Sequence, residues 1–163
     1  MYLNFDSIRN NHEEEIIYHG DKDKLNSLNH SSIIKDIKDV EGKIYLTKVN
    51  NILSLSFNLD VSLIIESAYT LKDIPYFIKI DETLYYTNDE SLESEEVFLT
   101  KNKLDLEEII YSLIITLVPL NAHGENETLP SSDEFKVYSE EELEKENSSN
   151  NESPFDILKD LDL

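Results

Sequence analysis

The sequence contains no cysteine, three glycines and one arginine, Arg9. Because there is no thiol, neither a disulfide framework nor a thiolate metal site can form. The few glycines make no Gly-rich motif, so we expect no loop that cradles phosphate groups. Phosphate backbones are held by clustered Lys and Arg, which are scarce here. We therefore do not expect direct, tight binding of RNA or DNA.

Long apolar runs are also missing. The longest, residues 109–120, is interrupted by Ser112 and Thr116. It falls short of the ~20 apolar residues that a membrane span needs. The first thirty residues hold no apolar stretch of the kind found in a cleaved signal peptide. We therefore expect a soluble, cytoplasmic protein with no membrane contact.

Acidic residues are abundant instead. Thirty-five Asp and Glu against fourteen Lys and Arg give a formal net charge of −21. Such a surface attracts basic partners by electrostatic steering, although the same charge also serves plain solubility. Hydrophobic content is 39% of the 163 residues, which is enough for one core. This length suits one domain of about 110–130 residues followed by a tail.

The middle of the chain has the pattern of β-strands. In residues 51–61, apolar side chains alternate with Ser, Asn and Asp, which predicts a strand with one buried face. Residues 42–49 are the expected partner strand, because Asn50-Asn51 suits a tight hairpin turn. Pro75 should lie at a strand start or edge, since it cannot donate to a ladder. Further extended segments are expected at 62–67, 74–80 and around 83–87.

Residues 104–118 are predicted to form the main helix. Asp105 is a natural N-cap, and Glu108 at the third helical position favours a reciprocal bond and the helix dipole. Pro119 ends the helix. The apolar stripe follows helical spacing through Leu106, Ile109, Ile110, Leu113, Ile114 and Leu117. A stripe this wide must pack against a sheet. We therefore expect an α+β fold, in which an antiparallel β-sheet or partial barrel is packed by this one main helix.

Composition divides the chain into three parts. Residues 1–120 form the expected α+β domain. Residues 121–153 form an acidic low-complexity linker with ten acidic and two basic residues. Such a linker cannot bury enough apolar surface to offset its ordering entropy, so we expect it to be largely disordered. Residues 154–163 are expected to be a short amphipathic docking segment.

The C-terminal segment has one apolar face. Ser153 can cap it, and Pro154 suits the first helical position. Phe155, Leu158 and Leu161 recur at i, i+3 and i+6. A helix this short does not persist alone in water, so its apolar face must rest on a surface. That surface is either the protein's own sheet or a groove on a partner, and in the second case these three residues bind the partner.

A family resemblance is carried by four stretches in order: VEGKIYLTKVNN, SLIIESAYTLKDIPYFIKI, LDLEEIIYSLIITLVPLNAHGE and SPFDILKDL. In sequence and spacing these stretches resemble the YceD family, over residues 38–163. The resemblance implies a bacterial or plastid protein that supports accumulation of large-subunit ribosomal RNA. Genes of this family commonly lie beside the gene of a small, basic protein of the large ribosomal subunit.

One family motif is only partly present. Family members usually carry Cys-x-Arg-(Thr or Cys)-Leu, and here Ser67 and Tyr69 stand at the Cys and Arg positions. Thr70 and Leu71 fit this motif, while Pro119 at the end of the helix and Pro154 near the end of the chain fit two other stretches of the family pattern. The roles of the family's Cys and Arg therefore cannot be transferred to this chain. Because the chain has no thiol, we also expect no structural zinc held by cysteines.

Patterns typical of enzymes and metal sites are incomplete. The run His-Glu-Glu-Glu from His12 lacks the second histidine of a zinc-protease motif, because Ile16 stands there. We interpret this run as a charged, exposed turn. The stretch from Asp21 lacks the Gly and Glu of a calcium loop. No Gly-x-Ser-x-Gly elbow occurs. We expect no enzymatic activity, no cofactor and no metal.

Resemblance and charge together predict a non-enzymatic accessory factor in ribosome biogenesis. It would support accumulation of large-subunit ribosomal RNA by binding a basic ribosomal protein or assembly factor. One alternative is an rRNA-processing cofactor or nuclease that binds RNA directly through Lys35, Lys38, Lys43 and Lys48. Another is a generic acidic adaptor protein unrelated to ribosomes. The oligomeric state stays open.

Overall fold

The computed structural model describes residues 1–124 and 127. Met1–Gly124 form one compact unit, and the description below concerns this unit. Its strands are β1 (Tyr2–Asn4), β2 (His12–His19), β3 (Ile34–Val49), β4 (Ile52–Glu66), β5 (Asp73–Thr87), β6 (Val97–Leu99) and β7 (Lys103–Asp105). Its helices are α1 (Lys22–Leu28) and α2 (Leu106–Leu117), with single 3₁₀ turns at η1 (Phe5–Ser7) and η2 (Glu90–Leu92).

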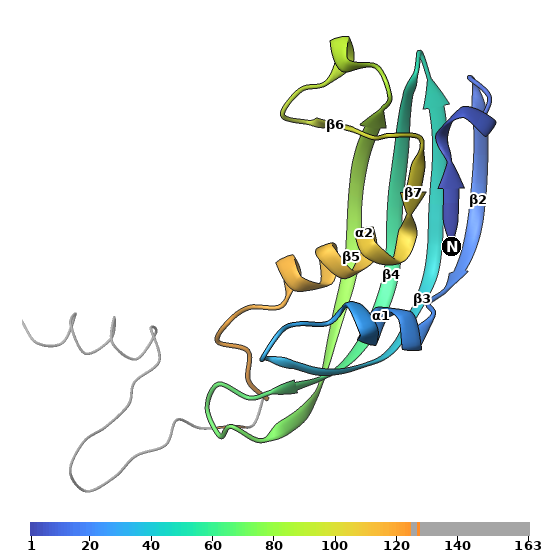
Figure 1. Ribbon diagram of the computed structural model, residues 1–163. Coiled ribbons are helices and arrows are strands. Elements are labelled where there is room, and N and C mark those ends of the chain that lie inside the picture. Colours follow the sequence, from blue (N-terminus) through green and yellow to red (C-terminus); the bar gives the residue numbers. More distant parts are fainter. Residues whose placement is uncertain (125–126, 128–163) are drawn as a thin grey trace, which may run out of the picture. The chain divides into compact units, whose positions relative to one another are not determined.

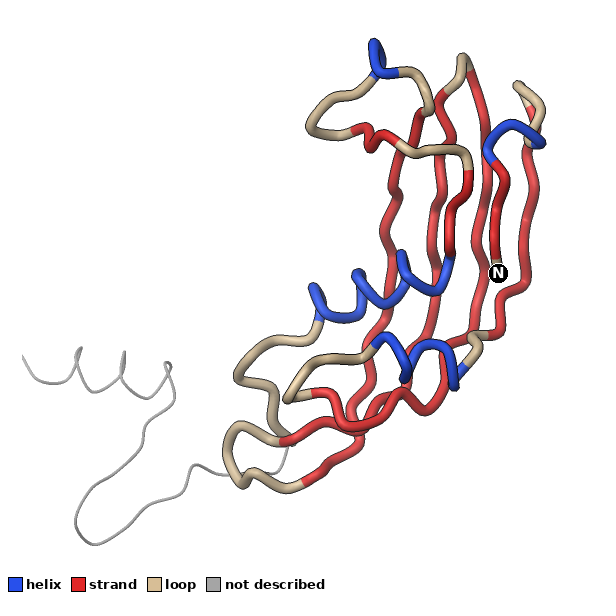
Figure 2. Tube along the Cα trace, viewed as in Figure 1, coloured by secondary structure: helices blue, strands red, loops and turns tan. Residues whose placement is uncertain are grey.

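These strands form two sheets within the described unit. The main sheet has the order β2-β3-β4-β5-β6, and β1 pairs separately with β7 (Figures 1 and 2). All strand pairs are antiparallel except β5–β6, which is parallel and short. The predicted α+β class is therefore confirmed. No α-helix among the described residues is long and apolar enough to cross a membrane.

The β3–β4 hairpin confirms the turn that was predicted from sequence. Asn50 and Asn51 both have positive φ, at 49° and 64°, and the register places Val49 opposite Ile52. Asn tolerates this backbone region better than most residues, which is why an Asn pair suits a two-residue turn. The segment expected separately at 62–67 continues β4 up to Glu66 instead of forming a new strand.

Strand β5 likewise joins two segments that were expected to be separate, 74–80 and 83–87. Pro75 lies near its start, as predicted. At the other end of the strand, the Thr87 carbonyl accepts a hydrogen bond of 2.8 Å from the Thr100 N–H, outside the β4 ladder. Because backbone groups alternate sides along a strand, odd-numbered residues of β5 point theirs away from β4. The missing N–H of Pro75 therefore does not interrupt the ladder with β4.

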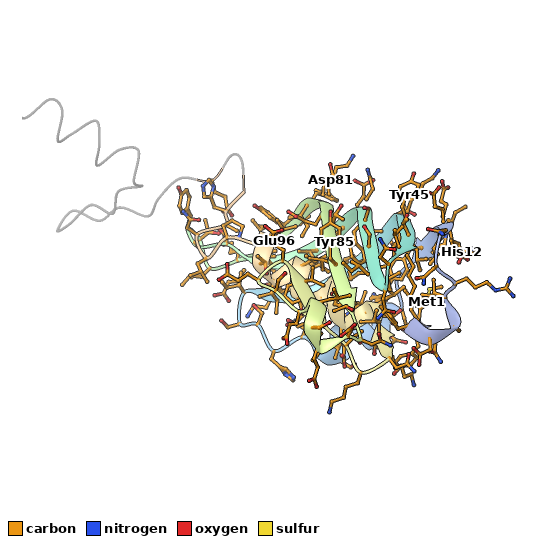
Figure 3. The ribbon with its side chains drawn as sticks, turned by 90° about the horizontal axis from the view of Figure 1, so that it is seen from above. Met1, His12, Tyr45, Asp81, Tyr85 and Glu96 are labelled. Carbon is orange, nitrogen blue, oxygen red and sulfur yellow. The ribbon has the colours of Figure 1, made fainter. Side chains whose placement is uncertain are left out.

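One face of the main sheet, which we call the inner face, carries the core. On β4 it is formed by every second residue, from Leu53 to Ile65. Leu25 of α1 and Ile110 and Ile114 of α2 are fully buried against this face, which the helices cover in Figure 1. The outer face carries mostly polar side chains, together with a few exposed apolar ones such as Ile17, Tyr45 and Phe77. In Figure 3, Tyr45 and Asp81 lie on the side of the sheet opposite to Met1.

Helix α2 forms where it was expected, with slightly shorter ends than 104–118. Asp105 caps it by accepting a hydrogen bond of 3.1 Å from the Glu107 N–H. The Asp105 side chain thus bonds the N–H of Glu107 and not that of Glu108, the residue with which a reciprocal bond was predicted. Val118 is the C-cap and Pro119 follows it, so the helix ends as predicted.

The first third of the chain is more structured than its sequence pattern indicates. The run of acidic residues after His12 was interpreted as an exposed turn, which is wrong, because it forms the first half of β2. Its side chains are exposed on both faces of β2, which is an edge strand of the sheet. The stretch from Asp21 forms α1, with the Asp21 side chain accepting from the Lys24 N–H at 3.1 Å.

Candidate functional site

An apolar groove runs between α2 and the ends of β5 and β6. Its volume is about 430 Å³. Leu84 and Tyr86 of β5, Phe98 of β6, and Ile109, Leu113 and Thr116 of α2 line it. We call this feature the α2–β5 groove. Its size falls within the range of roughly 300–1,000 Å³ that is typical of binding pockets.

The groove exists because the apolar stripe of α2 is wider than the surface that the sheet covers. Ile110 and Ile114 are buried, whereas Ile109 and Leu113 are only half-buried and face the groove. The facing wall is aromatic. The rings of Tyr86 and Phe98 lie 5.7 Å apart, and burial raises the pKa of Tyr86 to about 12. Phe98 keeps 49% of its surface exposed, so its ring stays open to a partner.

The surroundings of the groove are acidic. Glu108 lines it from α2, and Glu95 and Glu96 immediately precede β6. All three side chains are exposed, and no Lys or Arg among the described residues lies within ion-pair distance of them. Exposed carboxylates beside apolar surface favour a segment that brings both cations and apolar side chains.

A second polar cluster lies at the first turn of α2. Glu107 is 2% exposed and accepts hydrogen bonds from Tyr18 Oη and from Lys24 Nζ, both at 3.2 Å, and from the Met1 amino group. Lys24 Nζ also bonds both carboxylate oxygens of Asp105, at 2.8 and 2.7 Å. The cluster joins the chain's first residue, β2 and α1 to the start of α2.

Ionisation in this cluster follows from the contacts. Burial, and then the neighbouring Glu107 carboxylate, raise the pKa of Tyr18. Hydrogen bonds to Asp105 raise the pKa of Lys24. Burial opposes ionisation of Asp105, but the bonds from Lys24 outweigh it and lower the pKa of that carboxyl. Since each charge has an opposite partner, the cluster stabilises the fold and offers no unpaired group for catalysis. Sequence reasoning missed Glu107, because nothing in the helical pattern shows that it is buried.

Ser67, Tyr69, Thr70 and Leu71, the positions of the partly present family motif, lie in the turn between β4 and β5. Ser67 is buried, and its Oγ accepts from the N–H groups of Tyr69 at 3.1 Å and Thr70 at 3.3 Å. Leu71 is exposed and has φ of 58°. The Tyr69 ring stacks on His123, with ring centroids 3.8 Å apart. These positions therefore connect the turn to the segment after Pro119, and none of them lines the α2–β5 groove.

The four lysines considered for RNA binding are not free to form one patch. Lys48 is buried and donates to the carbonyl oxygens of Phe5 and Ile8, at 2.7 and 2.9 Å. The other three each form an ion pair: Lys35 with Glu66 at 3.3 Å, Lys38 with Asp36 at 2.6 Å, and Lys43 with Glu15 at 2.8 Å. This arrangement does not favour a phosphate-binding surface.

Two further features of the sequence analysis concern metal ligands and the C-terminal residues. Within residues 1–124 and 127, no three His, Asp or Glu side chains are grouped so that they could hold a metal ion. Pro154, Phe155, Leu158 and Leu161 lie outside the described residues, as does the predicted acidic linker from residue 128 onward.

Comparison with known proteins identifies no relative of this chain. No family model, curated protein or solved structure matches the chain. The resemblance to the YceD family therefore stays a prediction that rests on the quoted motifs.

Proposed function

We propose that the protein is a non-enzymatic accessory factor that binds a basic partner protein at the α2–β5 groove. The observation that carries this proposal is the groove itself: half-buried apolar side chains stand beside exposed carboxylates that form no ion pair with any described Lys or Arg. Glu108 is the clearest case, because it lines the groove directly. A partner rich in Lys or Arg would bury the apolar wall and neutralise the acidic surroundings together.

The resemblance to the YceD family supports a setting for this activity. We place it in the cytoplasm, during assembly of the large ribosomal subunit, with a basic ribosomal protein or assembly factor as the partner. Holding such a protein shields its cationic surface until ribosomal RNA takes its place. The net charge of −21 supports attraction of a basic protein and opposes direct contact with RNA.

A pull-down with the tagged full-length chain tests the proposal. We expect basic ribosomal proteins to be captured equally with and without ribonuclease treatment, because the contact is between proteins. Capture should fall as salt rises, since attraction between exposed charges decays over about 8–10 Å at physiological ionic strength. Capture that disappears after ribonuclease treatment would contradict the proposal.

Matched charge variants separate local recognition from net charge. The double variant Glu95→Gln/Glu96→Gln removes two carboxylates beside the groove. Glu13→Gln/Glu41→Gln removes two exposed carboxylates from β2 and β3, on the other side of the sheet. Both variants have the same net charge. We expect the first to weaken capture about tenfold and the second to change it little. Equal losses would show that only total charge matters.

A further inference from the structure

The outer edge of β5 is open along most of its length. β5 spans Asp73–Thr87, and β6 pairs only with Tyr85, Tyr86 and Thr87. Among the described residues, no strand lies beside the edge from Asp73 to Leu84. Proteins usually shorten or cover such edges, because an unpaired edge is a template for another strand.

The backbone groups of this edge are ready to pair. As the Thr87 carbonyl shows, odd-numbered residues of β5 point their backbone groups away from β4. The N–H groups of Phe77, Lys79, Asp81 and Thr83 therefore have no acceptor among the described residues. Pro75 has no N–H, so near the start of β5 the edge cannot donate this hydrogen bond to an added strand.

The inner face of the edge continues the groove. Leu84 lines the α2–β5 groove, and Tyr76 and Ile78 precede it on the same face, half-buried against the core. A strand added beside β5 would place every second side chain on this face, next to these residues. Its apolar side chains would thus extend the core, while its alternate side chains would stay on the outer face.

The charges along the edge select the partner. Asp73, Asp81 and Glu82 lie on β5, and the acidic pair that precedes β6 lies next to the point where the edge opens, since Val97 pairs with Tyr85. Lys79 is the one cation on β5. The edge therefore disfavours acidic strands, this chain's own acidic surface included, and favours a basic strand.

We propose that β5 binds a basic partner by strand addition: an extended segment, in which Lys or Arg alternates with apolar residues, pairs with Phe77–Thr83. This inference rests on the proposed function and specifies its mode. The main-chain bonds supply affinity, and the groove and carboxylates supply specificity. A basic amphipathic helix lying in the groove would leave the outward N–H groups of β5 unpaired.

Amide exchange measured by NMR on the full-length chain distinguishes the two modes. The probe is a synthetic peptide of about ten residues with alternating Lys and Val, which matches the length of the edge. In the free protein, the N–H groups of Phe77, Lys79, Asp81 and Thr83 should exchange fast, and those of Ile78 and Ile80 slowly. Saturating peptide should slow the four outward amides by about a hundredfold. Binding without this protection would overturn the proposal.

Two substitutions at one position provide the matched control. Asp81→Asn removes the charge and keeps the outward N–H, whereas Asp81→Pro removes both. We expect the Pro variant to bind the peptide at least about tenfold more weakly than the Asn variant. Circular dichroism and the melting temperature check that both are folded. If the Pro variant is unfolded, the amide exchange of the wild type decides alone. Equal affinity of two folded variants would refute strand addition.

Other occupants give different results. If the outward amides become protected at high protein concentration without peptide, the edge pairs with a second copy and the proposal is wrong. If deletion of residues 153–163 exposes amides that are protected in the full chain, the chain's own end occupies the edge, which also overturns it. If the peptide fails to bind while basic ribosomal proteins are still captured, strand addition fails and the proposed function stands. If neither binds, both fail.

Discussion

The first turn of α2 and the side of the same helix that faces β6 differ in whether their carboxylates are buried and paired. At the first turn, Glu107 is buried and accepts bonds from Tyr18, Lys24 and the Met1 amino group. One residue later, Glu108 is exposed beside the α2–β5 groove, with no cation within ion-pair distance in the described unit.

This difference has a physical cause. A buried carboxylate is tolerated only when partners replace its hydration, whereas an exposed one costs little when unpaired. Charge in α2 therefore stabilises the fold where it is buried and remains free for recognition where it is exposed. Neighbouring residues of one type thus have different roles, and substitutions can separate them.

The largest expected effect is on stability at the buried position. Glu107→Ala removes the acceptor of three donors, of which Tyr18 is buried and Lys24 half-buried, and should lower the free energy of unfolding by about 3 kcal/mol. Glu108→Ala should change it by less than about 0.5 kcal/mol. Urea denaturation of both variants measures this. Capture of basic proteins should show the reverse order, with Glu108→Ala the weaker binder. Similar stability losses in the two variants would contradict the comparison.

The aromatic wall of the groove provides the next test. Phe98→Ser removes an exposed ring from the groove and should weaken partner capture about tenfold. Tyr45→Ser removes an exposed ring of similar size from the outer face of β3 and should leave capture unchanged. Binding isotherms at one salt concentration compare them. A loss that is equal in both variants would mean that the groove is not the contact surface.

The pH dependence of stability tests the buried cluster. Bonds from Lys24 hold the pKa of Asp105 below the unfolded value of about 3.9. The carboxylate therefore contributes stability at neutral pH, and this contribution is lost as pH falls through the lowered pKa. Asp105→Asn keeps an N-cap oxygen but lacks the charge. The wild type should be the more stable at pH 7, and the gap should close on acidification, as urea unfolding at several pH values would show. A constant gap would mean that the ion pair adds nothing.

The smallest effect is expected at Tyr86 in the groove. Burial raises its pKa to about 12. A phenol that is harder to ionise in the folded state adds stability below its unfolded pKa of about 10, and this is lost as pH rises towards 12. Absorbance titration of tyrosinate in the wild type and in Tyr86→Phe should differ by one late-titrating group. A difference that appears near pH 10 would show that the groove is more solvated than the structure indicates.

Much of the fold follows from short-range patterns in the sequence. Alternation of apolar and polar residues predicted β4, an Asn pair predicted the hairpin turn, and Asp105 with Pro119 predicted both ends of α2. The acidic run after His12 was misinterpreted, because β2 is an edge strand with few buried residues and its pattern is therefore weak. Segment 62–67 was predicted to be separate from 51–61, and segment 74–80 separate from 83–87, because a local pattern does not show how far a strand continues.

The candidate site was less predictable. The sequence predicted an acidic surface that attracts a basic partner and placed the partner-binding residues at Phe155, Leu158 and Leu161, which lie outside the described part of the chain. The position of the groove was not predicted, because its walls come from α2, β5 and β6. Half-burial of Leu113 or Leu84 depends on which elements meet, and no local pattern reports that.

The sequence by itself determined the net charge, the absence of thiol chemistry, the hairpin turn and the limits of the main helix, because these depend on composition or on residues a few positions apart. Only the tertiary structure decided which charges are neutralised. Lys24 bonds Glu107 across 83 positions, and the buried Lys48 donates to the carbonyl oxygens of Phe5 and Ile8. Which carboxylates remain to attract a partner is set by these long-range contacts, because burial forces pairing and exposure does not.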